Sequence, residues 1–319
     1  MINTLGGYNQ FSFIDRNMKL HENGVKYQSA RAALYSYLCS SKPRALYLPN
    51  YLCDSILPLI NALNIPIKWY EVDSTLLPTL KPNVAKGELF LIVNYFGLIS
   101  NQIQNIVSSS PEQFIVDNSQ ALFSEYIYGT TTIYSPRKFL AIPDGGFLYT
   151  KNKLDEPKET YDAEKHVSHL ILRAAGDVST GYKYFLEAER SLEHYHPKKM
   201  SIISEYLIRC SDLCFIKRKR CEHYERLYNH FKDINLLDLP RDGNVPLCYP
   251  LHLNINVENI HKNLISKSIY LPRYWKSDFS CKHGEKFYQR TLFLPVDERI
   301  SDDQMLSLIS EIKSELATF

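Results

Sequence analysis

The sequence contains no uninterrupted apolar run of about 18 residues, the length that a membrane-spanning helix needs. Its first residues, MINTLGGYNQFSF, also lack the basic segment and the apolar stretch of a secretory signal peptide. The formal net charge is only +2, so no excess of positive charge indicates binding to nucleic acid or to a membrane surface. We therefore expect a cytoplasmic protein with no membrane or nucleic-acid partner.

Cysteine pairs are also missing. The seven cysteines are odd in number and form no C-x-x-C pair, which argues against a zinc site or a disulfide framework and favours a reducing compartment. His194 and His196, in the segment HYHPKK, have a spacing found in metal sites, but we interpret this segment as a surface loop. We therefore predict no metal site.

The remaining composition is that of a soluble globular protein. Of 319 residues, 45% are hydrophobic and 23% are charged, which suffices for a sizeable buried core. This length suits one large domain with a smaller companion, or two domains.

The first half of the chain alternates short apolar runs with segments of helical spacing. This alternation predicts an α/β sheet that is parallel for the most part, in which ligands bind at the carboxyl ends of the strands. Asn94, Asp117 and Ser135 each fall at a predicted strand end. The predicted helices cover residues 27–41 and 53–64, and the predicted strands cover residues 44–51, 65–73, 87–97, 112–119, 130–138 and 145–151.

The second half begins with helical patterns. Residues 202–232 have apolar spacing on one side and Lys and Arg on the other, which predicts one long helix with a solvated face. Strand patterns return at 247–256, 268–275 and 291–298, and a capping signal at Ser301 precedes a last amphipathic helix. We predict a large domain over residues 1–235 and a small α+β domain over residues 236–319.

Three separate features together match what a pyridoxal phosphate (PLP) site requires. Such a site needs a lysine for a Schiff base, a carboxylate at the pyridine nitrogen, and donors for a dianionic phosphate. The chain offers them in order as the helix start SARAAL at residues 29–34, then Asp117, then Lys138 three residues after Ser135. Each alone has a plainer interpretation, as a helix cap, a turn former or a surface lysine.

The chain resembles the DegT/DnrJ/EryC1/StrS family of PLP-dependent sugar aminotransferases. The resemblance runs through most of the chain and rests on the segments SARAAL, LYLPNY, VNYFG, VDNSQALFS, SPRKFLAIPDGG, IYLPRYW and LFLPVDERISDDQM. It implies PLP fold type I, with a seven-stranded, mostly parallel sheet between helices in the large domain. A family branch that replaces the lysine with histidine is a dehydratase, and the presence of Lys138 disfavours that branch.

The resemblance also implies roles for individual residues. Lys138 would form the Schiff base and carry the proton, and Asp117 would pair with the pyridine nitrogen. Gln120 would lie near the phenolic oxygen of the cofactor, and Ser135 would hold the phosphate through its hydroxyl. The backbone amides of Ala30 and Arg31 would complete the phosphate site. Tyr51 is a further expected cofactor contact, as a candidate for stacking on the ring.

Some positions depart from the family pattern. Arg31 stands in the phosphate turn, where many members have Thr or Ser, and its guanidinium has three possible positions: on the cofactor phosphate, in solvent, or on the phosphates of the substrate. Asn94 stands where many members have histidine. We expect Asn94 and Trp275 to be substrate-binding residues, although Trp275 could equally be a core residue.

The expected activity is therefore transfer of an amino group, from glutamate, to a keto group of a nucleotide-linked sugar. A homodimer is expected as well, with residues near 200–225 contributing to the second subunit's site. The alternative is a PLP-fold protein that has lost catalysis and serves as a binding or regulatory partner. The sugar, the ring carbon and the nucleotide stay open, and so does the pathway: a surface polysaccharide, a glycoprotein or a secondary metabolite.

Overall fold

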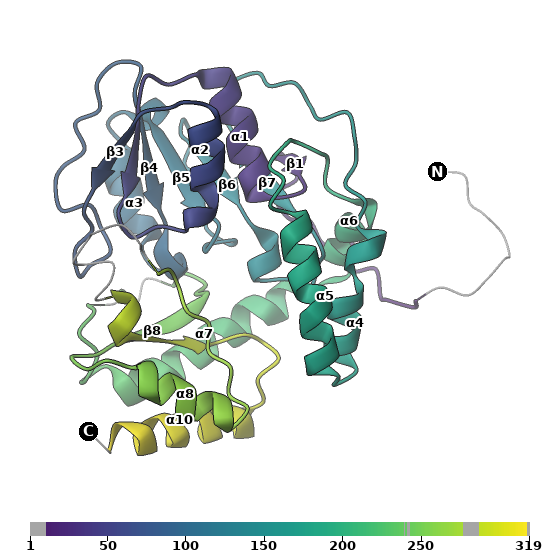
Figure 1. Ribbon diagram of the computed structural model, residues 1–319, viewed down its shortest axis with the longest axis vertical. Helices are drawn as coiled ribbons and strands as arrows, with labels where there is room; N and C mark the ends of the chain where they lie inside the picture. Colours follow the sequence, from purple (N-terminus) through teal and green to yellow (C-terminus); the bar gives the residue numbers. More distant parts are fainter. Residues whose placement is uncertain (1–10, 239, 241–242, 277–286, 318–319) are drawn as a thin grey trace, which may run out of the picture.

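The computed structural model describes residues 11–238, 240, 243–276 and 287–317. A seven-stranded sheet with the order β1-β7-β6-β5-β4-β2-β3 forms its larger part (Figure 1). The five strands from β6 to β3 pair in parallel, and β7 and β1 add an antiparallel edge. The strands are β1 (Val25–Tyr27), β2 (Leu46–Pro49), β3 (Ile67–Tyr70), β4 (Leu89–Val93), β5 (Phe114–Asn118), β6 (Thr131–Tyr134) and β7 (Gly146–Tyr149).

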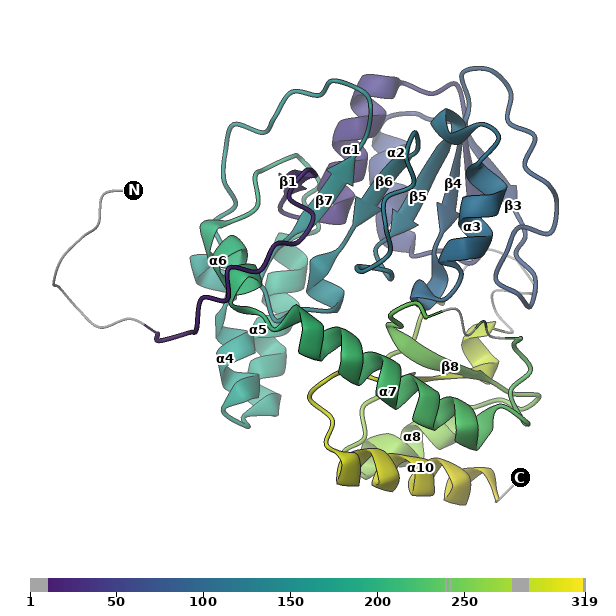
Figure 2. The same ribbon diagram turned by 180° about the vertical axis from the view of Figure 1, so that it is seen from behind.

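Helices cover both faces of this sheet. Helices α1 (Ala30–Ser41) and α2 (Leu57–Ala62) lie on the face turned toward the viewer in Figure 1, and α3 (Ser100–Val107) lies on the face seen in Figure 2. A sheet covered on both sides needs apolar residues throughout its strands. Strand β4 meets this need, because all five of its residues are buried. The predicted fold class, α/β with a mostly parallel sheet, is confirmed.

Among the described residues, five single turns of 3₁₀ helix connect helices and strands, and two of them begin two residues after the end of a strand. They are η1 (Asp54–Ile56), η2 (Tyr95–Gly97), η3 (Pro111–Gln113), η4 (Pro136–Lys138) and η5 (Glu164–His166). Because η2 follows β4 and η4 follows β6, both turns lie at the carboxyl edge of the parallel strands.

The segment 202–232 is not one helix. It forms α6 (Ile202–Cys210) and α7 (Leu213–Phe231), separated by Ser211 and Asp212, and Ser211 has extended backbone angles. The carboxylate of Asp212 accepts a hydrogen bond from the amide of Phe215 and caps α7. The sequence therefore indicates the break by a residue type that favours helix starts. Before these helices, α4 (Ser168–Ala174) and α5 (Val178–Ser191) form a helical hairpin.

The last part of the chain packs two strands against helices. Strands β8 (Cys248–His252) and β9 (Thr291–Pro295) pair antiparallel, and α8 (Glu258–Ser266) and α10 (Asp302–Leu316) lie beside them (Figures 1 and 2). Residues 287–290 are helical. The predicted cap at Ser301 is confirmed, since Ser301 and Gln304 form a capping box. The predicted strand at 268–275 is wrong: these residues are irregular.

Two absences hold for the part of the chain that the structure describes. None of its helices is both long and apolar enough to cross a membrane. Within the same residues, no group of three or more His, Cys, Asp or Glu side chains is placed to hold a metal ion. His194 and His196 are exposed, which confirms the surface-loop interpretation of their segment.

Candidate functional site

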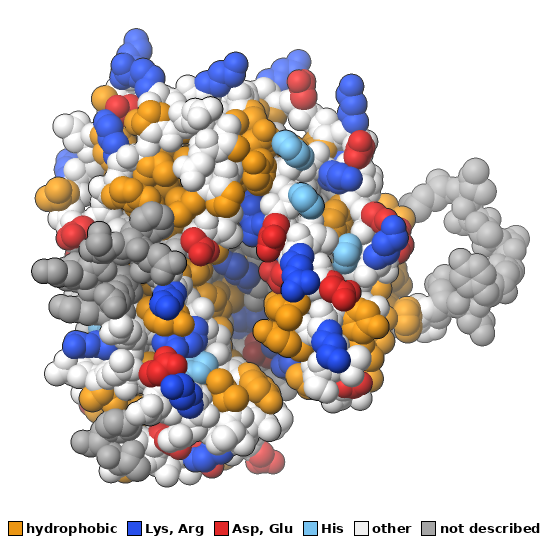
Figure 3. All heavy atoms as spheres, viewed as in Figure 1, with side chains coloured by type: hydrophobic (Ala, Val, Ile, Leu, Met, Phe, Trp, Pro, Cys, Tyr) orange, Lys and Arg blue, Asp and Glu red, His pale blue; other side chains and the backbone are white. Residues whose placement is uncertain are grey.

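The candidate site lies at the carboxyl edge of β4, β5 and β6. Asn94 directly follows β4, Asp117 is the penultimate residue of β5, and Ser135 directly follows β6, so the predicted strand-end positions are confirmed. The edge faces the C-terminal part of the molecule, because the amide of Leu247 donates a 2.8 Å hydrogen bond to the carbonyl of Phe96 in η2. Figure 3 shows a hollow between these two parts, with Lys and Arg side chains at its floor.

Asp117 retains an available carboxylate oxygen. Its Oδ1 accepts a 2.8 Å hydrogen bond from the amide of Ser119, which fixes the side chain. No donor contacts Oδ2 among the described residues. A carboxylate held in this way can accept one further charged hydrogen bond, such as that of a protonated ring nitrogen.

Gln120 is buried, and only one of its two side-chain polar atoms has a hydrogen-bond partner among the described residues. Its side-chain oxygen accepts a 3.0 Å hydrogen bond from the amide of Phe96, while its Nε2 has no acceptor among the described residues. The residue is only 1% exposed, so this orphaned donor is not paired with bulk water. Buried donors are normally satisfied, and an unsatisfied one points to a missing partner that can accept a hydrogen bond.

Lys138 and Ser135 frame one short turn. Ser135 precedes η4, and its hydroxyl makes no capping bond to that turn. Lys138 ends η4; its side chain is partly buried and has no ion pair or hydrogen bond within the described part of the chain. Both polar groups are therefore available to a ligand, in contrast to the neighbouring Arg137, which pairs with Glu189 on α5.

The start of α1 is brought to the same place by Gly146. A Cβ atom at this glycine would lie 2.2 Å from the carbonyl carbon of Ser29 and 2.4 Å from the nitrogen of Ala30. The Ser29 hydroxyl caps the helix by accepting a 3.1 Å bond from Ala32, and the amide of Arg31 has no acceptor in the described structure. A helix start with an open amide is suited to bind an anion.

We expect Gly146→Ala to damage both stability and the helix start. A methyl group this close to backbone atoms must push β7 and α1 apart, and overpacking of this kind costs about 1–3 kcal/mol or more. The variant should unfold at a lower denaturant concentration than wild type.

The matched control is Gly181→Ala in α5, where the nearest atoms lie at 3.4 Å and an alanine fits. If both alanines leave the stability unchanged, the close approach of β7 to α1 is not rigid.

The Arg31 guanidinium contacts protein rather than solvent. Its Nη1 donates a 2.9 Å hydrogen bond to the carbonyl of Leu192 at the end of α5, and its Nε is buried without a partner in the described structure. In this conformation the side chain ties α1 to α5. The contribution of Arg31 to a phosphate site would then come from its backbone amide.

Asn94 lies on the opposite face of the sheet from Asp117. Its Nδ2 donates hydrogen bonds to Asn118 (3.0 Å) and to Ser100 (2.9 Å) at the start of α3. Asn118 and Asp117 are successive residues of one strand, and successive strand side chains point to opposite faces. Asn94 is 1% exposed in this polar network, which favours a structural role over the predicted substrate contact.

Tyr51 and Trp275 belong to an aromatic cluster under the same edge. The Tyr51 ring lies 5.4 Å from that of Tyr95, 5.1 Å from that of Trp275 and 4.7 Å from that of Phe287, and its hydroxyl donates to the carbonyl of Tyr274. Burial raises the pKa of Tyr51 well above its usual value. The surrounding rings leave Tyr51 little surface for a cofactor, while Trp275 remains partly exposed.

Sequence reasoning missed Tyr95. Tyr95 is 1% exposed in η2, directly after Asn94, and burial raises the pKa of its hydroxyl well above the usual value. That hydroxyl donates to the carbonyl of Tyr51. The available signal was its position directly after Asn94 in VNYFG.

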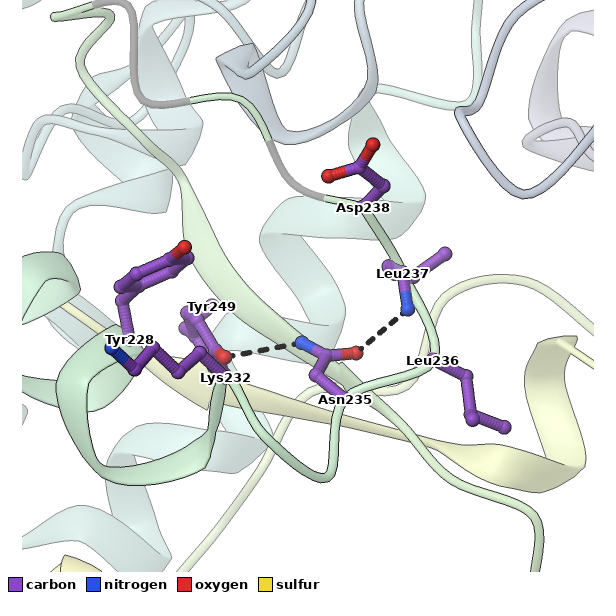
Figure 4. Close-up of a pocket in the computed structure, with 7 residues that line it drawn as sticks. All are labelled: Tyr228, Lys232, Asn235, Leu236, Leu237, Asp238 and Tyr249. Atoms are coloured by element: carbon purple, nitrogen blue, oxygen red, sulfur yellow. Dashed lines mark hydrogen bonds between the residues drawn. The ribbon is translucent and has the colours of Figure 1, made fainter.

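A distinct pocket lies away from this edge, at the end of α7. It has a volume of about 310 Å³ and is lined by Tyr228, Lys232, Asn235, Leu236, Leu237, Asp238 and Tyr249 (Figure 4). Asn235 donates to the Tyr249 hydroxyl and accepts from the Leu237 amide, so its polar atoms hold the pocket wall together. None of the predicted site residues lines this pocket.

Comparison with known proteins gives a fold but no sequence family. No protein-family model matches the sequence, and a search of curated proteins finds no match either. Among solved structures, a DegT DnrJ EryC1 StrS aminotransferase from Brucella abortus superposes with a TM-score of 0.63 at 16% identity, over 91% of this chain and 85% of that one.

Two other solved structures are similar in the same way. The sugar aminotransferase CalS13 from Micromonospora echinospora gives a TM-score of 0.61 at 14% identity, over 91% of this chain and 86% of its own. The PLP form of Spr1654 from Streptococcus pneumoniae gives the same TM-score, identity and shares. At these identities the likeness shows the fold, which is that of the fold type I aminotransferases.

Proposed function

We propose that this chain is a PLP-dependent aminotransferase that transfers an amino group, with glutamate as donor, to a keto group of a nucleotide-linked sugar. The observation that supports it most is the gathering of available polar groups at one sheet edge. The Lys138 amine, an oxygen of Asp117 and the Gln120 amide are all without a partner among the described residues. The fold, shared with solved aminotransferases of the DegT type, supports the same conclusion.

The residues present fit the cofactor. When bound, PLP would supply an aldehyde for the amine of Lys138 and a ring that accepts electrons. Asp117 would hold the ring nitrogen protonated, and the buried Nε2 of Gln120 would donate to an anionic ring oxygen. The Ser135 hydroxyl and the first amides of α1, at Ala30 and Arg31, would hold the phosphate.

Lys138 would also move the proton of the reaction. An amine that is released from its covalent bond, yet tethered beside the reacting carbon, can remove a proton there and return one. Its amine has no ion-pair partner among the described residues, so no carboxylate holds it away from a bound cofactor. This favours a catalytic role for the turn over a purely regulatory one.

The remaining proposals concern assembly and location. We propose a cytoplasmic homodimer of chains with a large domain at 1–235 and a small one at 236–319. The region 200–225 is proposed to lie near the second subunit, and Ile202, which is 75% exposed, and Phe215, which is 38% exposed, offer apolar surface there.

The half-reaction with glutamate tests this function. Purified protein loaded with PLP should change its absorbance spectrum on addition of glutamate, and one equivalent of 2-oxoglutarate should be released. Keto sugars linked to different nucleotides should then restore the first spectrum. A spectrum that neither glutamate nor other amino acids change would contradict the proposal.

A substitution at Arg31 separates its side chain from its amide. Arg31→Ala should lower the free energy of unfolding by about 1–2 kcal/mol, since it removes a hydrogen bond from a charged group to Leu192. PLP affinity should change by less than about twofold, because the backbone amide remains. Denaturant unfolding and PLP titration of the apo-protein measure the two effects. Loss of more than tenfold in PLP affinity with unchanged stability would instead place the guanidinium on the phosphate.

A further inference from the structure

Arg220 is a buried cation beside the turn that carries Lys138. It lies on α7, which passes from α6 toward β8 below the sheet (Figure 2), and it is 3% exposed. Its guanidinium carbon lies 4.7 Å from the ring centre of Phe139, the residue that follows Lys138. Its Nη1 donates to the carbonyl of Leu247 at 3.2 Å, just before β8.

The charge of Arg220 is incompletely matched. Its Nε lies 3.7 Å from the Oε2 of Glu298, and neither atom has a hydrogen-bond partner in the described part of the chain. Burying a guanidinium without full hydrogen bonding costs free energy that a well-packed apolar side chain would not cost. Stability alone therefore does not explain an arginine here.

The contacts of Arg220 instead connect the C-terminal part of the molecule to η4. The Phe139 ring contacts both the Arg220 guanidinium and the Phe123 ring, whose centroid lies 5.6 Å away in an edge-on arrangement, and Phe139 is 3% exposed. The amides of Phe139 and Leu140 both donate to the carbonyl of Pro136, which closes the turn around Lys138. Fixing the Phe139 ring therefore fixes the backbone from which the lysine projects.

We propose that Arg220 is a positioning residue: it clamps Phe139 against the C-terminal part of the molecule and thereby sets the position of the Lys138 amine. Glu298 orients the guanidinium. A change in the position of residues 247 or 298 would therefore move Arg220 and, through Phe139, the turn that carries Lys138. The proposal rests on the proposed function only in assigning Lys138 its task.

The first test compares Arg220→Met, Arg220→Lys and Glu298→Gln with a matched control. The control is Arg218→Met. Arg218 lies on the same helix and also has an aromatic ring, Phe215, and a glutamate, Glu222, as partners, but its side chain is exposed. Methionine at 220 should weaken PLP affinity about tenfold and shift the pH midpoint of the PLP absorbance by more than about half a unit. Lysine should rescue only in part, since an ammonium lacks the planar surface that stacks on a ring. Glu298→Gln should show a smaller effect in the same direction, and the control none.

The second test does not need the cofactor. Amide hydrogen exchange at Phe139 and Leu140 in the apo-protein should be about tenfold faster in Arg220→Met than in wild type, and unchanged in Arg218→Met. If Arg220→Met does not fold, the same comparison is made with Arg220→Lys and Glu298→Gln. If hydrogen exchange and PLP titration of these variants match those of wild type, the positioning role of Arg220 is overturned. A wild-type protein that binds no PLP would instead overturn only the proposed function.

Discussion

Replacing Lys138 by alanine should leave a folded protein that binds PLP but no longer bonds to it covalently. The phosphate and ring contacts proposed for Asp117, Gln120, Ser135 and the start of α1 would remain, so some affinity should be kept. Loss of the proton carrier alone should reduce turnover by about 10²–10⁴-fold. Because the variant also loses the nucleophile, the total reduction should be larger. Steady-state transamination and the visible spectrum of the loaded protein measure the two losses.

Lys151→Ala is the control for this substitution. Lys151 follows β7, and its amine lies 4.2 Å from the ring centre of Tyr128, away from the sheet edge that carries Lys138. Its removal should change neither the spectrum nor the rate. Turnover that survives in Lys138→Ala would end the assignment of Lys138.

Replacing Asp117 by asparagine should reduce turnover by at least about 100-fold without unfolding the protein. Asparagine keeps the shape and can still accept the hydrogen bond from the Ser119 amide. It cannot hold the ring nitrogen protonated, because its amide carries no charge to stabilise the pyridinium. Thermal unfolding and initial rates, measured on the same preparation, separate the two expectations.

Asp177→Asn controls for the loss of a carboxylate as such. Asp177 also accepts a backbone amide, that of Thr180, but it caps α5 at a distance from the sheet edge. Its rate should equal that of wild type, since asparagine is an equally good cap. Near wild-type turnover in Asp117→Asn would mean that another residue holds the ring.

The strands of the sheet were predictable where they are fully buried. The run at β4 is apolar at every position, and β5 and β6 end at polar residues that mark the edge of the sheet. Strand β1 was not predicted from the residues, because three residues carry too little pattern. It is defined by its pairing with β7, a contact between segments about 120 residues apart.

The candidate site was predictable in its residues but not in the directions of their side chains. Asn94 and Asp117 both stand at strand ends, yet the register pairs Val93 with Asp117, so Asn94 shares a face with Asn118 instead. A shift of one residue along a strand changes the face, and only the pairing of strands decides it. The surroundings of Tyr51 were not predictable either, because the rings that enclose it come from residues more than 40 positions away.

The break between α6 and α7 shows a local signal that helical periodicity concealed. Apolar spacing continues across the break, while Asp212 provides a capping side chain for a new helix. Capping residues inside a periodic run therefore indicate boundaries that the period does not. The segment 268–275 shows the reverse: its apolar residues have strand-like spacing, but they pack as irregular chain against the aromatic cluster.

Borohydride reduction of the protein loaded with PLP tests whether Lys138 is the residue that bonds to the cofactor. Reduction makes a Schiff base permanent, so peptide mass spectrometry can locate it. We expect one reduced pyridoxal phosphate group, on the peptide that contains Lys138, and none in Lys138→Ala. A label on another lysine, or no label on a protein that retains PLP, would contradict it.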